Sequence, residues 1–287
     1  MHLLMILMAL AIALGLRQGN LNGQSPQPTP PRSLNQRWRH NIIALVAPVL
    51  LLLSTAIAVL CMGAQGQMVW QGTGLASYLL SWLFLIASLS CLTRQTLQLR
   101  RTVSQLRRYP QTTILGYSCR VLDDTALFSA QVGGWNPELT ITQGLLDHLN
   151  GDRLAAVLAH EQGHRVYRDT FWFFWLGLCY RLTPWLPNSD DLWQDLLLLR
   201  EIRADAWAAQ QVDELLLAES LLDVVRAPLR STTPFEAAFS CTAPPSRLEQ
   251  RIDALLCGTR PGLTFGWQGL LQLAWVVFPL AIIPFHH

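Results

Sequence analysis

The sequence has no lysine, so all 21 of its basic residues are arginines. It also has no acidic residue before Asp123 and no charged residue between Asn41 and Thr93. A long uncharged stretch is poorly suited to the water-exposed surface of a soluble domain, so these absences argue against one in this part of the chain. With 51% hydrophobic and 14% charged residues, the composition is typical of a membrane protein.

The cysteines and glycines lack the spacings that mark several common sites. No two of the six cysteines form a CxxC pair, which argues against a cysteine-bound zinc ion or a disulfide framework. No glycine-rich phosphate-binding loop is present. The arginines between Arg94 and Arg108 directly follow an apolar segment, so we expect a membrane-surface helix against anionic lipid and no nucleic-acid partner.

Apolar runs divide the chain into a membrane region, a more polar domain and a last span. We predict a membrane region over residues 1–93, a domain over residues 94–260 and a C-terminal transmembrane helix in residues 261–287. The other spans are expected near residues 1–16, 41–62 and 75–92, about four transmembrane helices in all. A signal peptide is the alternative for residues 1–16, but no basic residue stands at its start. Residues 17–40 contain four prolines and are expected to form a loop or tether.

The arginines next to these spans predict an orientation. Arg17–Arg39 and Arg94–Arg108 flank the second and third spans at the same side of the membrane, whereas the segment Gly63–Gly74 between those spans carries no charge. Arginine-rich loops stay preferentially in the cytoplasm. We therefore expect both basic segments, and the domain that follows Arg94, to be cytoplasmic.

The chemistry is concentrated in an HExxH motif, His160-Glu161-Gln162-Gly163-His164. Residues at positions i and i+4 of a helix point to one side, so His160 and His164 can bind a single zinc ion. Glu161 can act as the general base and then the general acid, taking a proton from the attacking water and passing it to the leaving amine. The alternative without metal is a purely structural helix in which two buried histidines pair with acidic residues.

A catalytic zinc site needs a third protein ligand, and a second helical run supplies a candidate. Glu201 and Asp205 are again separated by four residues, within Arg200-Glu201-Ile202-Arg203-Ala204-Asp205. We expect Glu201 to be the third ligand and Asp205 to accept a hydrogen bond from a ligating histidine, which fixes the tautomer of that histidine. Taken alone, the pair could equally be a solvated, salt-bridged helix face.

These two motifs resemble those of membrane zinc metallopeptidases of the gluzincin type, the HtpX and CAAX-prenyl-protease group and the BlaR/MecR-type peptidases. Asp169, five residues after His164, is similar to a residue of these families. So are the segments Trp135–Leu146 and Pro244–Ile252, so that the resemblance covers about residues 123–256. Gln162 stands where these families more often have an apolar residue, which leaves the subfamily open.

The resemblance implies a mainly α membrane protein with an α+β zincin-like catalytic domain. It implies a membrane-embedded zinc-dependent metalloendopeptidase that hydrolyses peptide bonds in cytoplasmic or membrane-proximal proteins. Zn²⁺ is then the cofactor, a protein or peptide the substrate, the lipid bilayer a partner, and the plasma (inner) membrane of a bacterium the location. One alternative is a signal-transducing regulatory peptidase that cleaves one regulator and has a sensor partner. The other is a non-catalytic membrane scaffold.

Strand-like alternation between Val121 and Ile141 predicts a small sheet beside the motif. In the families that the chain resembles, such an edge strand binds the substrate backbone next to zinc, as strand addition allows. A hairpin with a purely structural role is the alternative. Arg251 and Tyr167 are candidates for stabilising the oxyanion, although the sequence does not distinguish between them and either could be structural.

Overall fold

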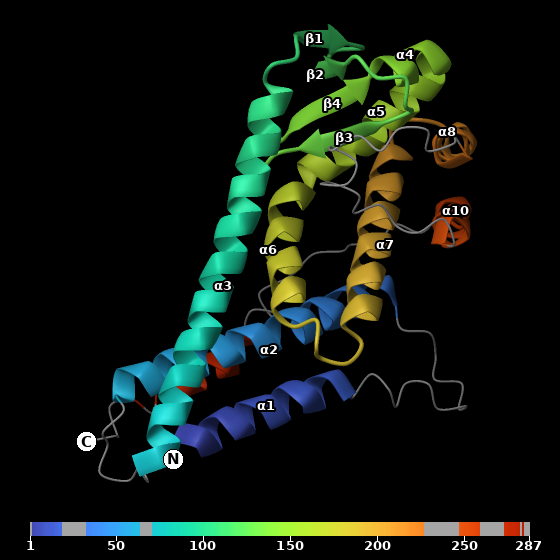
Figure 1. Ribbon diagram of the computed structural model, residues 1–287. Helices are drawn as coiled ribbons and strands as arrows, with labels where there is room; N and C mark the ends of the chain where they lie inside the picture. Colours follow the sequence, from blue (N-terminus) through green and yellow to red (C-terminus); the bar gives the residue numbers. More distant parts are fainter. Residues whose placement is uncertain are drawn as a thin grey trace. The chain divides into compact units, whose positions relative to one another are not determined.

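The computed structural model describes residues 2–18, 33–63, 71–226, 247–258, 273–281 and 283. The chain divides into two compact units. The first comprises Met1–Arg94, Leu176–Trp193 and Leu263–His287, and the second Gln95–Trp175 and Gln194–Gly262. The helices and strands of each unit are shown in Figure 1.

The first unit contains two neighbouring apolar helices, α1 (His2–Gln18) and α2 (Leu34–Met62). They lie side by side in Figure 1. Small residues allow this close contact: Ala9 of α1 packs with Ala47 and Leu51 of α2 in one buried cluster. The cluster also contains Val276, from a short 3₁₀ helix, η3 (Ala274–Val277), that precedes α12 (Phe278–Ala281).

Helix α2 begins earlier than the sequence pattern predicted. Residues 34–40 are helical, so the expected loop or tether over residues 17–40 is wrong at its carboxyl end. The cause is a capping box at Ser33, whose side chain accepts a hydrogen bond from the Gln36 backbone N–H while the Gln36 side chain accepts one from the Ser33 backbone N–H. These reciprocal bonds satisfy two donors that a helix start otherwise leaves unpaired.

Two helices in the described residues are long and apolar enough to cross a membrane, Leu34–Met62 and Gly74–Leu106. They correspond to the spans predicted near residues 41–62 and 75–92. The predicted span near residues 1–16 is the 17-residue helix α1, shorter than those two. Most of the predicted C-terminal span lies outside the described residues. Four transmembrane helices are therefore not confirmed.

Helix α3 (Gln71–Leu106) is a single helix through the arginine-rich segment. The sequence predicted a separate membrane-surface helix beginning near Arg94. No proline or glycine lies between Leu75 and Leu106 to end the first helix, so α3 continues.

The second unit contains a four-stranded sheet with the strand order β1-β2-β4-β3. The strands are β1 (Gln111–Ile114), β2 (Tyr117–Leu122), β3 (Ser129–Val132) and β4 (Glu138–Thr142). Strand β2 pairs in parallel with β4, and the other neighbours are antiparallel. Strand β3 is therefore an edge, and one side of its backbone is unpaired within the sheet.

The remaining helices of the described chain follow the sheet in sequence. They are α4 (Gln143–His148), α5 (Gly151–Val166), α6 (Asp169–Leu182), α7 (Ser189–Ala208), α8 (Glu214–Arg226) and α10 (Leu248–Leu256). The chain is mainly helical with one small mixed sheet, as the predicted combination of helices and an α+β domain requires.

Helix α5 is central to the second unit because it is buried on two sides. On one side Leu154 and Leu158 pack against Leu139 and Ile141 of β4. On another side Ala156 and Ala159 pack in a cluster with apolar residues of α8 and α10. This burial fixes the position of the helix that carries the HExxH motif.

Candidate metal centre

The HExxH motif lies in the second half of α5, as predicted. The helix begins at a capped end, where the Asn150 side chain accepts a hydrogen bond from the Arg153 backbone N–H at 3.1 Å. No proline interrupts it, so His160 and His164 stand one turn apart on one side. Both histidines and Glu161 are buried.

Helix α7 approaches α5 closely at Gly163, inside the motif. A Cβ atom built on Gly163 would lie 3.1 Å from the Cα atom of Ala204. Glycine and alanine at the contact allow the two backbones to approach each other closely. Ala204 stands between Glu201 and Asp205, so this contact brings both predicted carboxylates to the histidines.

The two histidines and Glu201 form one compact group of possible metal ligands, whose ligand atoms all lie within 4.8 Å of one another. The Nε2 atoms of His160 and His164 are 3.2 Å apart. Glu201 places Oε2 3.4 Å from Nε2 of His160 and Oε1 3.7 Å from Nε2 of His164. Ligands of tetrahedral zinc at about 2.0–2.1 Å from the ion are separated by roughly 3.3 Å. The group therefore fits such an ion.

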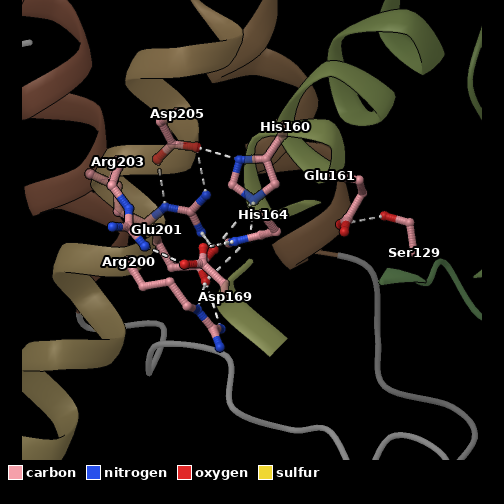
Figure 2. A network of polar contacts seen from close by, with 10 residues as sticks. Ser129, His160, Glu161, His164, Asp169, Arg200, Glu201, Arg203 and Asp205 are labelled. Carbon is pink, nitrogen blue, oxygen red and sulfur yellow. Dashed lines mark hydrogen bonds and ion pairs between the residues drawn. The ribbon is translucent and has the colours of Figure 1, made fainter. Parts of the chain in front are cut away.

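The outer nitrogens of both histidines lie against carboxylates (Figure 2). Nδ1 of His160 lies 2.7 Å from Oδ1 of Asp205, in an ion-pair contact without the alignment of a linear hydrogen bond. Nδ1 of His164 is 2.8 Å from Oδ2 of Asp169. A carboxylate beside Nδ1 favours a proton on that nitrogen and leaves Nε2 as the ligand atom.

This arrangement points two Nε2 lone pairs toward each other. At 3.2 Å and out of contact with bulk water, two lone pairs repel unless a cation lies between them. Either a proton on one imidazole or a metal ion meets that need. The geometry is therefore that of a site in which a cation, either a proton or a metal ion, lies between the two imidazoles.

Arginines balance the carboxylates. Arg251 donates two hydrogen bonds to Asp205, Nε to Oδ2 and Nη2 to Oδ1, each at 2.9 Å. Its Nη1 lies 3.4 Å from Oε2 of Glu201. Arg200 donates to Oε1 of Glu201 from Nη2 at 2.7 Å and from Nε at 3.0 Å. Arg251, one of the two candidates for stabilising the oxyanion, thus directs its guanidinium at Asp205 and Glu201.

The charges around the site shift several pKa values. Burial alone would lower the pKa of His160, but the negative charges of Asp205 and Glu201 raise it to about 10. Burial would raise the pKa of Glu201, but Arg200, His164 and Arg251 hold it well below its usual range. The pKa of Asp205 is likewise lowered, because Arg251 and His160 outweigh its burial. The surrounding charges thus favour a positive charge on His160 and keep the carboxylates of Glu201 and Asp205 ionised.

Asp169 contacts the candidate metal centre, although sequence reasoning gave it no role. Arg168, at φ 54°, lies in the turn between α5 and α6, and Asp169 at the start of α6 points back to His164. The other oxygen of Asp169 accepts from Arg203, whose guanidinium lies 4.3 Å from the centre of the Tyr167 ring. The spacing of five residues after His164 was the available signal. Tyr167, the other oxyanion candidate, packs against this outer pair.

Glu161 extends from α5 toward strand β3, away from Glu201 and Asp205 (Figure 2). Its Oε1 accepts a hydrogen bond from the Ser129 hydroxyl at 3.0 Å. The structure thus brings together all five predicted site residues within one unit: Glu161, His160, His164, Glu201 and Asp205. It adds Ser129, Asp169, Arg200 and Arg203, which the motif did not identify as site residues.

Comparison with known proteins gives one match. Residues 93–179 match the sequence profile of peptidase family M48, which confirms that this part of the chain resembles a gluzincin-type metallopeptidase. The matched region contains the HExxH motif and Asp169 but ends before Glu201. No curated protein and no solved structure matches the chain.

Proposed function

We propose that this chain is a membrane-embedded zinc-dependent metalloendopeptidase, in which His160, His164 and Glu201 bind Zn²⁺. The similarity of residues 93–179 to peptidase family M48 supports a metallopeptidase, and a peptidase acts on a protein or peptide. The proposal for the metal rests on the residues themselves. Two imidazoles and one carboxylate, in a group that a tetrahedral ion fits, are the donor set of many catalytic zinc sites.

The observation that carries the proposal is the pair of Nε2 atoms that face each other at 3.2 Å. Asp205 and Asp169 keep protons on the two Nδ1 atoms, which makes both Nε2 atoms available as ligands. A proton shared by two structural histidines is the alternative, and the carboxylate of Glu201, within 3.7 Å of both Nε2 atoms, favours a metal ion instead. The network is better explained as support for a metal.

The proposed division of labour follows from the positions of the side chains. Zinc, when bound, would act as a Lewis acid that lowers the pKa of the attacking water and polarises the scissile carbonyl. Glu161 takes the proton of the attacking water and delivers it to the leaving amine, since it stands next to the ligand His160 without belonging to the ligand group. Asp205 and Asp169 orient the imidazoles. Arg200 and Arg251 keep Glu201 ionised and in place.

Membrane embedding is supported by the apolar helices Leu34–Met62 and Gly74–Leu106. The arginines that border these helices favour a cytoplasmic location for the metal centre, by the excess of basic residues on the cytoplasmic side. The substrates are then cytoplasmic or membrane-proximal proteins.

The test combines metal content with proteolysis on detergent-purified protein. Wild type is expected to bind one zinc ion per chain and to cleave an unfolded model protein. Glu161→Gln is expected to bind zinc equally and to lose cleavage by at least a hundredfold, because general acid–base catalysis contributes about 10²–10⁴ in rate. His164→Ala is expected to lose both. Gln162→Ala, in the same motif but outside the proposed chemistry, serves as the control.

Retained cleavage in Glu161→Gln would refute the assigned base. Stoichiometric zinc in His164→Ala would refute the ligand set. If wild type binds zinc but cleaves neither the model protein nor itself, the chain is not a general endopeptidase, and the regulatory and scaffold alternatives take its place.

A further inference from the structure

Strand register directs one side chain of the sheet edge at the motif helix. Ser129 is the first residue of β3 and stands opposite Ile141 of β4. Paired residues of neighbouring strands project to the same face of a sheet. Ile141 packs against α5, so Ser129 also projects toward α5. The next residue, Ala130, projects to the opposite face with Leu122 and Val132.

The Ser129 side chain meets Glu161 there. Its hydroxyl donates to Oε1 of Glu161 at 3.0 Å, and Glu161 is only 6% exposed (Figure 2). Among the residues that the structure describes, Ser129 is the side chain that donates a hydrogen bond to Glu161. A buried carboxylate gains much from one well-placed donor, because water is largely excluded from it.

The position of Ser129 is itself fixed by the preceding loop. The backbone N–H of Phe128 donates to Oγ1 of Thr142 at 3.1 Å, and the Thr142 hydroxyl donates to the carbonyl of Ala126 at 2.6 Å. The Gly144 N–H donates to the carbonyl of Asp124 at 2.8 Å. These bonds attach the loop to the end of β4, so Ser129 enters the strand at a defined place.

We infer that Ser129 is a positioning residue for the general base of the proposed peptidase. Its hydroxyl occupies one oxygen of the Glu161 carboxylate, fixes the rotation of that group, and leaves the other oxygen to accept and return the proton of water. The inference rests on the proposed function. It adds a residue outside both sequence motifs and assigns it to orientation of Glu161 rather than to metal binding.

The same residue relates the base to the substrate. Strand β3 is the edge of the sheet and can pair with an extended peptide through its backbone. Ser129 belongs to that edge by its backbone and contacts Glu161 by its side chain. The base is thereby positioned relative to the strand on which the scissile peptide would lie.

The experiment compares Ser129→Ala and Ser129→Thr with wild type, all zinc-loaded and in the full chain. Ser118→Ala is the matched control, since Ser118 lies on β2 of the same sheet and its hydroxyl accepts a hydrogen bond from the side chain of Gln111, far from the motif in sequence. Steady-state kinetics on a peptide substrate, zinc content and melting temperature are measured for each. A second readout is the affinity for a peptidyl hydroxamate, whose acidic proton passes to a neighbouring base.

We expect Ser129→Ala to lower kcat about ten- to a hundredfold, as expected for loss of a hydrogen bond to a charged group, and to leave KM and zinc content unchanged. Hydroxamate affinity should fall by a similar factor. Ser129→Thr keeps the hydroxyl and should restore most of kcat, and Ser118→Ala should match wild type.

Several results would overturn the inference. Equal kcat in Ser129→Ala and wild type removes the positioning role while leaving the peptidase proposal intact. A loss in Ser129→Ala that Ser129→Thr does not restore, or that follows a loss of zinc, makes the residue structural. Absence of cleavage in wild type refutes the proposed function itself, and the positioning role falls with it.

Discussion

Helices α2 and α5 bury polar side chains in opposite ways. In α2, Ser54 and Thr55 donate to backbone carbonyls, Thr55 to Leu51 of its own helix and Ser54 to both Leu51 and Val276. No charged residue is needed there. In α5, the buried His160 and His164 each contact two carboxylates, from Glu201 and either Asp205 or Asp169, and arginines surround the carboxylates.

The comparison teaches where the fold tolerates change. The hydroxyls of α2 donate to neutral backbone carbonyls, so the loss of one leaves no buried charge without a partner. Around α5 and α7, four carboxylates and three guanidinium groups surround two imidazoles, and each carboxylate contacts at least one other member or Ser129. Removing one member leaves its partners charged and buried.

The largest effect should come from Arg251→Ala. Two buried carboxylates, Asp205 and Glu201, would lose a shared partner, and we expect a destabilisation of about 3–5 kcal/mol. Thermal unfolding in detergent, with zinc removed by a chelator, measures it. Arg247→Ala is the control, because the contact of Arg247 within the described part of the chain is a 3.7 Å approach to Asp195. Equal melting temperatures for the two variants would show that the buried network adds little stability.

The second-largest loss of stability is expected from Gly163→Ala. The added methyl group would meet the Ala204 backbone at 3.1 Å and separate α5 from α7, at a cost of about 1–3 kcal/mol. Glu201 would then move away from the histidines, so zinc affinity should fall as well. Gly151→Ala, at the start of the same helix with nothing within 4 Å, is the matched control. Unchanged zinc affinity in Gly163→Ala would contradict the role assigned to this contact.

Asp205→Asn removes the negative charge beside the proposed ligand His160 without changing the size of the side chain. We expect zinc affinity to fall about 10–100-fold, since outer partners of ligating histidines typically contribute that much. Competition with a fluorescent chelator measures the affinity. Asp152→Asn on the exposed first turn of α5 should leave it unchanged. An equal affinity in Asp205→Asn and wild type would mean that Asp205 pairs with Arg251 alone.

Zinc uptake should depend on pH through His160. Carboxylates outweigh burial and raise its pKa to about 10 in the metal-free protein, so zinc must displace a proton below that pH. Apparent affinity should therefore rise about tenfold per pH unit between pH 7 and 9. In the metal-free protein, the raised pKa adds stability that is complete below the ordinary value of 6.5 and is lost as pH rises through about 10. Calorimetric titration in buffers of different ionisation enthalpy counts the released protons, and a count of zero contradicts this pKa.

The smallest effect is expected from Ser54→Ala in α2. Its hydroxyl donates to the Val276 carbonyl at 2.6 Å, but neutral hydrogen bonds between helices contribute little, on average about 0.6 kcal/mol in membrane proteins. The shift in melting temperature should be close to the error of the measurement. A loss as large as that of Arg251→Ala would erase the contrast between the two helices.

The sequence predicted the centre of the site better than its surroundings. Helical periodicity places His160 beside His164 and Glu201 beside Asp205, because spacing along one helix is a local property. Helix contacts between distant segments are not local, and nothing in the sequence shows that Gly163 meets Ala204. Arg200 reads as an ordinary surface arginine and Arg251 as a candidate for the oxyanion, until the fold brings both to the carboxylates.

The predicted membrane region also shows what the sequence alone could not determine. Hydropathy located α2 and the first part of α3, but not their ends, which depend on the capping box at Ser33 and on the absence of a helix breaker near Arg94. Hydropathy also does not tell a span from a buried helix. The apolar window of α2 is 72% buried inside the protein and that of α3 only 11%, so α3 exposes far more apolar surface than α2.

The three proposed ligands are divided unevenly along the chain. His160 and His164 come from one turn of α5, and the turn at Arg168 brings Asp169 to His164. These three residues lie close together in the sequence, so their part of the site can form as soon as the local chain folds. Glu201 arrives only after two further helices. A metal bound by all three would close a loop between residues 164 and 201, much as a disulfide does, and would lower the entropy of the unfolded chain. The ion would thus also act as a cross-link that joins α5 to α7.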